Sequence, residues 1–304
     1  MNSFIELDRL VSPSIFMICG VGEEGRKHKC LVYKRRKSLK LSAIGQQDEY
    51  STELWLSVSS RSLFTNYGLA RSTIPQRRYN EDWSEHHKKH IQIVGKSNAE
   101  VVLLGDSLVF GLNRYKKLWT ENFTPLNTLN LALKGDRTQN TLWRLQETKL
   151  PPTTRVVVVL VGTNNCNFDT PKEIAEGIAS IAAIALELRP GIKIILCGLL
   201  PREIKKTPRR YACMEVNVHL RKFVLSGNLR GLMFLEPDDD LTFSNGRLNL
   251  KYFYEDFVHL NFFGYEKLSK AIVTAILKAL SGKKKRKSGR YLWHNFLVFN
   301  FIYV

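Results

Sequence analysis

A serine stands at the end of a short apolar run, where its hydroxyl could act as a nucleophile. Residues 101–104 form the kind of run that a buried parallel strand shows, and Gly105, Asp106 and Ser107 follow directly. The carboxyl ends of parallel strands make the edge at which open α/β sheets build their ligand sites. A turn with a helix cap would leave the same tripeptide, so this motif alone leaves both interpretations open.

A second pair of residues could supply the base that such a serine needs. Asp256 and His259 are three residues apart, and we expect them at the start of the last helix, on one side of one turn. The carboxylate could then hold one imidazole nitrogen and leave the other to take the proton of Ser107. The alternative is a buried core histidine with a helix-capping aspartate.

Acyl transfer also develops an oxyanion, which requires preorganised hydrogen-bond donors. The candidates are the backbone N–H groups of Ser107 and Gly135 and the side-chain amide of Asn164. Gly135 has no side chain to block the approach of a substrate oxygen. A turn glycine and a turn-forming or capping asparagine are the alternatives. Because these residues follow successive strands in order, the sequence favours a joint catalytic site.

The elements that must position these residues alternate along the chain. The expected strands are 101–104, 126–131, 155–161, 193–198 and 232–235. The expected helices are 81–94, 113–122, 138–149, 171–188, 209–225 and 262–280. This alternation predicts an α/β fold with a five-stranded parallel sheet, helices on both faces and residues 155–161 as the central strand.

Charge divides the chain into three segments. The net charge is +18, yet residues 81–280 carry 27 basic and 21 acidic side chains, a net of only +6. We expect a basic, mostly disordered segment at 1–79, a catalytic domain at 80–281 and a basic, then apolar tail at 282–304. The flanks suggest weak contact with anionic lipid or nucleic acid. We expect a cytoplasmic protein, with nuclear import through the basic runs 34–37 and 283–287 as the alternative.

Cysteine and histidine usage argues against a metal or a disulfide framework. The five cysteines show no regular spacing, which is typical of a reduced compartment. His86 and His90 have metal-ligand spacing on a helix, but no further ligand accompanies them, so we interpret them as part of a solvated face. We therefore expect no metal and no cofactor.

Residues 101–280 resemble the SGNH (GDSL-type) esterase family. The resemblance rests on Gly105-Asp106-Ser107, on Gly135, on Gly162-Thr163-Asn164 and on residues 256–259. It implies a flavodoxin-like, three-layer α/β/α fold and a metal-free acyl hydrolase with Ser107, His259 and Asp256 as its triad.

Within that family the chain is similar to the catalytic subunits of type Ib platelet-activating-factor acetylhydrolases, through the stretches GDSLV, GDRTQNTLWRL, VGTNN and GLLPR. This likeness implies an ester substrate with a short acyl group, namely acetyl, on a phospholipid or another ester, and a homo- or heterodimer. It also implies a tight acyl pocket of Leu108, Thr163 and Val258. Lys134 departs from the glycine-rich pattern before Gly135, and Val258 is smaller than the leucine expected there.

Two further interpretations remain open at this stage. The domain could be catalytically idle and bind RNA or a protein, which its basic character would suit. It could also be an esterase joined to flanks that bind nucleic acid. The intact set of catalytic residue types favours an esterase over the first of these.

Overall fold

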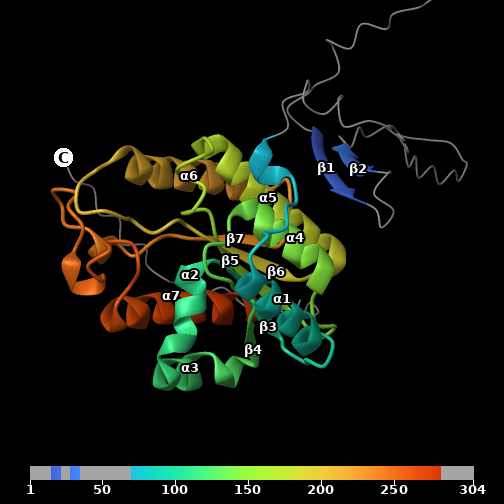
Figure 1. Ribbon diagram of the computed structural model, residues 1–304, viewed down its shortest axis with the longest axis horizontal. Helices are drawn as coiled ribbons and strands as arrows, with labels where there is room; N and C mark the ends of the chain where they lie inside the picture. Colours follow the sequence, from blue (N-terminus) through green and yellow to red (C-terminus); the bar gives the residue numbers. More distant parts are fainter. Residues whose placement is uncertain (1–14, 22–27, 35–69, 282–304) are drawn as a thin grey trace, which may run out of the picture.

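A computed structural model describes residues 15–21, 28–34 and 70–281, and the account below is restricted to them (Figure 1). Its main sheet has five parallel strands in the order β4-β3-β5-β6-β7. Their bounds are Val101–Gly105 for β3, Thr128–Asn130 for β4, Val156–Leu160 for β5, Lys193–Cys197 for β6 and Leu232–Leu235 for β7. The hydrophobic run predicted to be central, β5, lies in the middle of the sheet, and the predicted α/β class is confirmed.

Seven α-helices accompany the sheet within the described residues. They are α1 (Glu81–Val94), α2 (Ser107–Phe110), α3 (Lys116–Asn122), α4 (Thr138–Thr148), α5 (Pro171–Leu188), α6 (Pro208–Leu225) and α7 (Phe262–Leu280). In Figure 1, α4, α5 and α6 lie on one side of the sheet and α3 and α7 on the other, which gives three layers.

Apolar periodicity explains how these layers pack. All five residues of β5 are buried, as expected for a strand covered on both faces. On α5, Ile174, Ile178 and Ile181 recur at helical spacing and are almost fully buried against the sheet. Thr170 begins this helix with a capping box, and Pro171 occupies its first turn.

The segment after β3 differs from the sequence-based expectation. We expected a single helix over 113–122, but α2 begins at Ser107, a 3-10 turn spans Gly111–Arg114 and α3 begins only at Lys116. Asp106 explains the early start, because its side chain accepts a hydrogen bond from the N–H of Leu108 and caps α2.

Residues 70–79 are held to the helical layer formed by α4 and α5. The hydroxyl of Ser72 donates to the carbonyl of Glu173 at 2.5 Å, and the carbonyl of Ser72 accepts from Thr138 at 2.9 Å. The N–H of Gln76 donates to the carbonyl of Gln139, and the Gln76 carbonyl accepts from the Asn140 amide, both at 2.9 Å. These ten residues, here called the strap, connect α4 to α5.

The flanks lie largely outside the described residues. An antiparallel pair, β1 (Ile15–Val21) and β2 (His28–Lys34), is described within the N-terminal segment. The rest of 1–69, including residues 35–37 of the basic run, and all of 282–304 are not described, so the predicted disorder and the division into three segments stay predictions. Within the part that is described, no helix has both the length and the apolar character that a bilayer crossing needs.

Candidate active site

Ser107 lies at the junction between strand β3 and helix α2. It is the first residue of that helix and follows β3 after Gly105 and Asp106. A Cβ atom at Gly105 would meet the Leu160 carbonyl oxygen and a methyl group of Val109, each at 2.4 Å. Glycine is therefore required at this position for β3 to pass β5 and α2 this closely.

Ser107, His259 and Asp256 form a continuous chain of hydrogen bonds. The Nε2 atom of His259 lies 2.8 Å from the Ser107 hydroxyl, and its Nδ1 atom lies 2.6 Å from Oδ2 of Asp256. The other carboxylate oxygen, Oδ1, accepts from the backbone N–H groups of Val258 at 3.0 Å and His259 at 2.9 Å. Ser107 and His259, which are 152 positions apart in sequence, thus lie within the hydrogen-bond distance that proton transfer requires.

The backbone around Asp256 corrects one expectation. We expected Asp256 and His259 on the first turn of the last helix, but α7 begins at Phe262, and a tight turn precedes it, with Phe257 in the left-handed region at a φ of 57°. The turn brings the two side chains together because Asp256 accepts from the backbone two and three residues on, as aspartates in turns commonly do.

Hydrogen bonding keeps the Asp256 carboxylate charged. Burial alone would raise its pKa, but the N–H of His259, the His259 ring and the N–H of Val258 together lower the pKa below its ordinary value. The side chains of Asp256 and His259 remain about half and about two-fifths exposed, at 50% and 39%. Solvent and substrate can therefore reach this end of the chain of hydrogen bonds.

Three groups that could stabilise an oxyanion lie at the ends of β3, β4 and β5. Among the described residues, the backbone N–H groups of Ser107 and Gly135 have no hydrogen-bond acceptor. Asn164 donates one amide hydrogen to the Asp136 carbonyl at 2.9 Å, which leaves its second hydrogen free. Gly135 has a φ of 74°, a conformation that favours glycine.

A buried ion pair that the sequence reasoning missed fixes the loop that carries Gly135. Asp136 is fully buried, and Arg144 of α4 binds one of its oxygens through Nε at 2.8 Å and Nη2 at 2.6 Å. The indole N–H of Trp83 on α1 donates to the other oxygen at 2.7 Å. Arg144 also donates to the Leu131 carbonyl at 2.7 Å. The loop is thereby tied to two helices.

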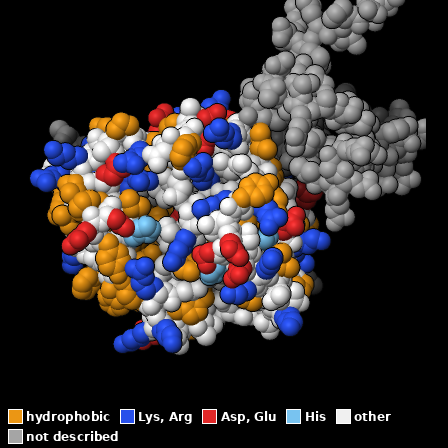
Figure 2. Space-filling model, in the orientation of Figure 1, with side chains coloured by type: hydrophobic (Ala, Val, Ile, Leu, Met, Phe, Trp, Pro, Cys, Tyr) orange, Lys and Arg blue, Asp and Glu red, His pale blue; other side chains and the backbone are white. Residues whose placement is uncertain are grey.

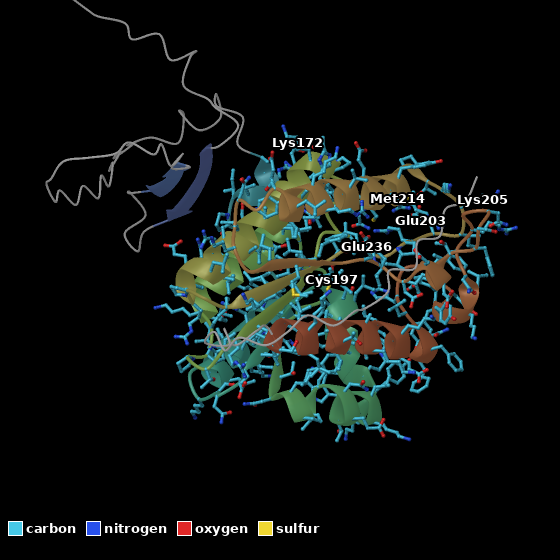
Figure 3. The ribbon with its side chains drawn as sticks, turned by 180° about the vertical axis from the view of Figure 1, so that it is seen from behind. Lys172, Cys197, Glu203, Lys205, Met214 and Glu236 are labelled. Carbon is cyan, nitrogen blue, oxygen red and sulfur yellow. The ribbon has the colours of Figure 1, made fainter. Side chains whose placement is uncertain are left out.

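The three residues expected to line an acyl pocket are each next in sequence to a candidate catalytic or oxyanion-binding residue. Leu108 follows Ser107 and is buried, Thr163 precedes Asn164 and is buried, and Val258 precedes His259 and is partly buried. Arg202 donates to the carbonyl of Thr163 at 2.9 Å and to its hydroxyl at 3.1 Å. Arg202 belongs to the loop that follows β6. Figure 3 labels Cys197, the last residue of that strand, and Glu203 and Lys205 in the loop.

Asp106, next to the serine, is a buried carboxyl with an unusual environment. Among the described residues, its Oδ2 atom has no hydrogen-bond partner. Burial raises the pKa of the group to about 7, although the N–H groups of Leu108 and Gly162 oppose this. The carboxyl therefore titrates near neutral pH.

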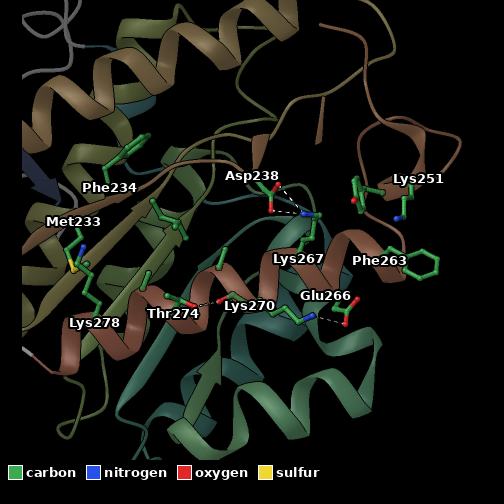
Figure 4. A pocket seen from close by; sticks show the side chains of 14 residues that line it. Met233, Phe234, Asp238, Lys251, Phe263, Glu266, Lys267, Lys270, Thr274 and Lys278 are labelled. Carbon is green, nitrogen blue, oxygen red and sulfur yellow. Dashed lines mark hydrogen bonds and ion pairs between the residues drawn. The ribbon is translucent and has the colours of Figure 1, made fainter. Parts of the chain in front are cut away.

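Two other features lie away from these residues. A groove of about 640 Å³ between β7 and α7 is lined by Phe234, Lys267 and their neighbours and contains none of the candidate residues (Figure 4). In residues 15–21, 28–34 and 70–281 no group of three His, Cys, Asp or Glu side chains could hold a metal ion. His90 is partly buried on α1, not on a fully solvated face as its spacing suggested.

Comparison with known proteins agrees with the geometry. Residues 103–267 match the model of the GDSL-like lipase/acylhydrolase family. The chain belongs to this family. Two curated relatives are each 34% identical to this chain over the aligned residues. They are platelet-activating factor acetylhydrolase IB subunit alpha2 of Homo sapiens, over 67% of this chain and 88% of its own length, and subunit alpha1 of Rattus norvegicus, over 66% and 84%.

A solved structure confirms the fold of this acylhydrolase family member. The crystal structure of a GDSL-like lipase from Bacteroides thetaiotaomicron superposes with a TM-score of 0.52 and 22% identity, and covers 65% of this chain and 98% of its own. At this identity the likeness concerns the fold alone.

Proposed function

We propose that the protein is a serine esterase with Ser107 as nucleophile, His259 as general base and Asp256 as the group that orients the imidazole and stabilises its protonated form. The hydrogen-bonded chain from Ser107 through His259 to Asp256, with distances of 2.8 and 2.6 Å, is the observation that carries the proposal. Membership of an acylhydrolase family supports the same chemistry.

In the first half of the reaction, the Ser107 oxygen attacks the ester carbonyl while its proton passes to Nε2 of His259. The carbonyl oxygen becomes an oxyanion, for which the N–H groups of Ser107 and Gly135 and the free amide hydrogen of Asn164 are the donors. Collapse of this intermediate breaks the bond to the alcohol, and His259 returns the proton to the leaving oxygen.

In the second half, water replaces the alcohol. His259 takes a proton from the water as it attacks the acyl-serine. Collapse of the second oxyanion breaks the bond to the Ser107 oxygen, which takes the proton back from His259, and releases the carboxylic acid. Throughout, the low pKa of Asp256 keeps its carboxylate ionised, so that it stabilises the imidazolium formed in each half.

We propose a short acyl group, acetyl above all, on a phospholipid or another ester. Leu108, Thr163 and Val258 adjoin Ser107, Asn164 and His259, so side chains would limit the room for an acyl chain. The curated relatives are named as acetylhydrolases of platelet-activating factor, which supports an acetyl ester. A homo- or heterodimer and a cytoplasmic or nuclear location stay predictions.

Hydrolysis of p-nitrophenyl esters with two, four and eight carbons tests the proposal. The full chain should hydrolyse the acetate fastest, and Ser107→Ala should abolish turnover without lowering the melting temperature much. If a folded wild-type protein releases no p-nitrophenol from any of the three, the esterase proposal fails for these substrates.

A binding role is the second candidate, and the basic flanks favour it. Of the net charge of +18, +12 lies outside residues 81–280. Such a charge attracts nucleic acid without sequence preference. Salt-sensitive RNA binding by the Ser107→Ala protein, together with a lack of esterase turnover by wild type, would favour this candidate over the esterase.

A further inference from the structure

Three cationic side chains surround the loop that carries Gly135. They are Arg78 of the strap and, on the loop itself, Lys134 and Arg137. In the orientation of Figure 1, Lys and Arg side chains are spread over the face toward the viewer (Figure 2). What sets these three apart is their position beside a proposed oxyanion donor.

Arg78 lies directly against Gly135. Its Nη1 atom donates to the Lys134 carbonyl at 2.9 Å. A Cβ atom built on Gly135 would meet Nη1 at 2.7 Å and Nη2 at 3.4 Å. The guanidinium thus occupies the space that a side chain at position 135 would fill. Because glycine has no side chain to occupy this space, the Arg78 guanidinium lies directly against the loop that carries Gly135.

Lys134 and Arg137 extend the positive charge to either side. The Lys134 ammonium lies 5.0 Å from the ring centre of Phe110, one helical turn after Ser107 on α2. The Arg137 guanidinium lies 3.7 Å from the ring centre of Phe168. Both cations therefore rest on aromatic faces, which hold them without neutralising them.

Carboxylates in the neighbourhood do not cancel this charge. Among the described residues, none of the three cations has a carboxylate within ion-pair distance, whereas Asp136 is fully buried and paired with Arg144. The nearby Asp169 accepts from the Asn165 amide at 2.7 Å. Burial lowers the pKa of Arg137; the charge of Asp169 opposes this shift, and the charges of Arg78 and Arg71 add to it.

We propose that Arg78, Lys134 and Arg137 form an anion subsite beside Gly135, which selects acyl esters that carry a phosphate or carboxylate group on the alcohol side. This inference rests on the proposed esterase function and narrows its substrate class. A bound anion relieves the repulsion between the cations and accepts charge-assisted hydrogen bonds from Arg78, whose planar fork suits both phosphate and carboxylate. A quaternary ammonium group on the substrate is not required.

Matched substrates test the subsite directly. We would compare kcat/KM for 4-acetoxybenzoate with that for its uncharged methyl ester, and for 1-acetylglycerol 3-phosphate with that for 1-acetylglycerol. The two pairs distinguish a carboxylate from a phosphate. The anionic member of at least one pair should be preferred about tenfold or more, and the preference should shrink as ionic strength rises.

Variants assign the preference to these residues. Arg78→Gln and Lys134→Gln should each reduce the anion-to-neutral ratio of kcat/KM several-fold, because the loss falls mainly on the anionic ester. Lys193→Gln is the matched control, because Lys193 is exposed at the first residue of β6, the opposite end of the strand from the site. Equal losses on neutral and anionic esters, or an unchanged ratio in both variants, would overturn the inference.

The failure of the subsite and the failure of the esterase give different results. Ser107-dependent hydrolysis of the neutral esters without anion preference would leave the esterase and overturn the subsite. If no ester is hydrolysed, calorimetric binding of 4-acetamidobenzoate, with its methyl ester as the uncharged control, tests the subsite. Binding that Arg78→Gln weakens would support the subsite, and equal binding of the two compounds would exclude it.

Discussion

Both oxygens of the Asp256 carboxylate face hydrogen-bond donors. Oδ1 accepts two backbone N–H groups, and Oδ2 faces the His259 ring. An amide in its place would keep the turn, since its oxygen can still accept from the backbone. The charge beside the imidazole would be lost, and with it the carboxylate oxygen that fixes the ring's tautomer.

Asp256→Asn should therefore separate catalysis from folding. We expect kcat to fall by about a thousandfold to ten-thousandfold, because the imidazolium loses its counter-charge and the ring its tautomer. The melting temperature should change little, since the side chain is half exposed. Asp239→Asn, on an exposed carboxylate of another turn, is the control. A loss below tenfold would contradict the role proposed for Asp256.

Asp106 leads to a prediction about stability and pH. Its folded pKa of about 7 exceeds the ordinary value of 3.8, so between these values the unfolded chain loses its proton while the folded protein keeps it. Stability contributed by the protonated carboxyl is complete below about pH 4 and is lost as pH rises to about 7. The loss amounts to at most about 4 kcal/mol.

Asp106→Asn should remove this dependence. The asparagine oxygen can still cap α2 at Leu108, and the amide does not ionise. The free energy of unfolding of the variant relative to wild type should therefore increase between pH 5 and pH 8 in urea titrations. A constant difference across that range would show that Asp106 is not the group that titrates.

The sequence allowed the reactive residues to be predicted better than the residues that hold them. Ser107, Gly135 and Asn164 were proposed because their types suit acyl transfer and each follows a strand, and their roles stay predictions. The ion pair of Asp136 with Arg144, and its bond to Trp83, had no such signal. Trp83 and Asp136 are 53 positions apart, and nothing in a single sequence indicates that a buried charge has found its partner.

At the scale of elements, the indole N–H of Trp83 links α1 to the loop that carries Gly135, through its hydrogen bond to Asp136. Trp83→Phe removes this donor and keeps most of the buried ring. We expect the free energy of unfolding to fall by about 1.5–3 kcal/mol, because an ionised oxygen of Asp136 is left without a donor. We expect kcat to fall several-fold with little change in KM, since the loop loses one of its restraints.

Trp119→Phe provides the matched control for this experiment. Trp119 lies on α3 and stacks on Phe123, with ring centres 4.9 Å apart, away from Asp136. Urea titration and ester kinetics on both variants would separate a general effect of tryptophan loss from the specific one. If both variants lose activity equally, the tether through Trp83 has no special part in positioning the loop.

The strap gives a second prediction at this scale. A chain that begins at Asn80 lacks the bonds from Ser72 and Gln76 to α4 and α5. It should melt at a temperature several degrees below that of a chain that begins at Ala70, as expected when a few net hydrogen bonds are lost. Equal melting curves in calorimetry would show that the strap adds no stability.

Helices and strands were predicted well where an apolar period or a cap marks them. The expected bounds of α1, α5 and α7 agree with the structure, and β7 agrees as well. The short α2 was missed because four residues show no helical period. The turn at Asp256 was missed because it depends on the left-handed backbone of Phe257, which no residue type there indicates.

At the scale of the whole molecule, the positive charge is divided between the catalytic part and its flanks. Residues 70–281 carry 30 Lys and Arg against 21 Asp and Glu, a net of +9, which is half of the +18 of the full chain. The flanks therefore hold as much net charge in 92 residues as the catalytic part does in 212.

Removal of both flanks should weaken binding to polyanions more than it affects catalysis. We expect residues 70–281 to leave a heparin column at lower salt than the full chain and to bind single-stranded RNA with a shallower salt dependence. Turnover of an uncharged acetyl ester should be the same for both chains. Elution of both at one salt concentration would show that the flanks contribute no polyanion binding.

The strap also has a consequence for control of the molecule. Tyr79 exposes 94% of its side chain, and it follows Arg78, the strap residue that lies against Gly135. A single proteolytic cut after Tyr79 would leave Ser107, Asp256 and His259 on one fragment and the Arg78 guanidinium on the other. Release of the fragment that carries Arg78 would thus reduce the proposed preference for anionic esters, without any change to Ser107, Asp256 or His259.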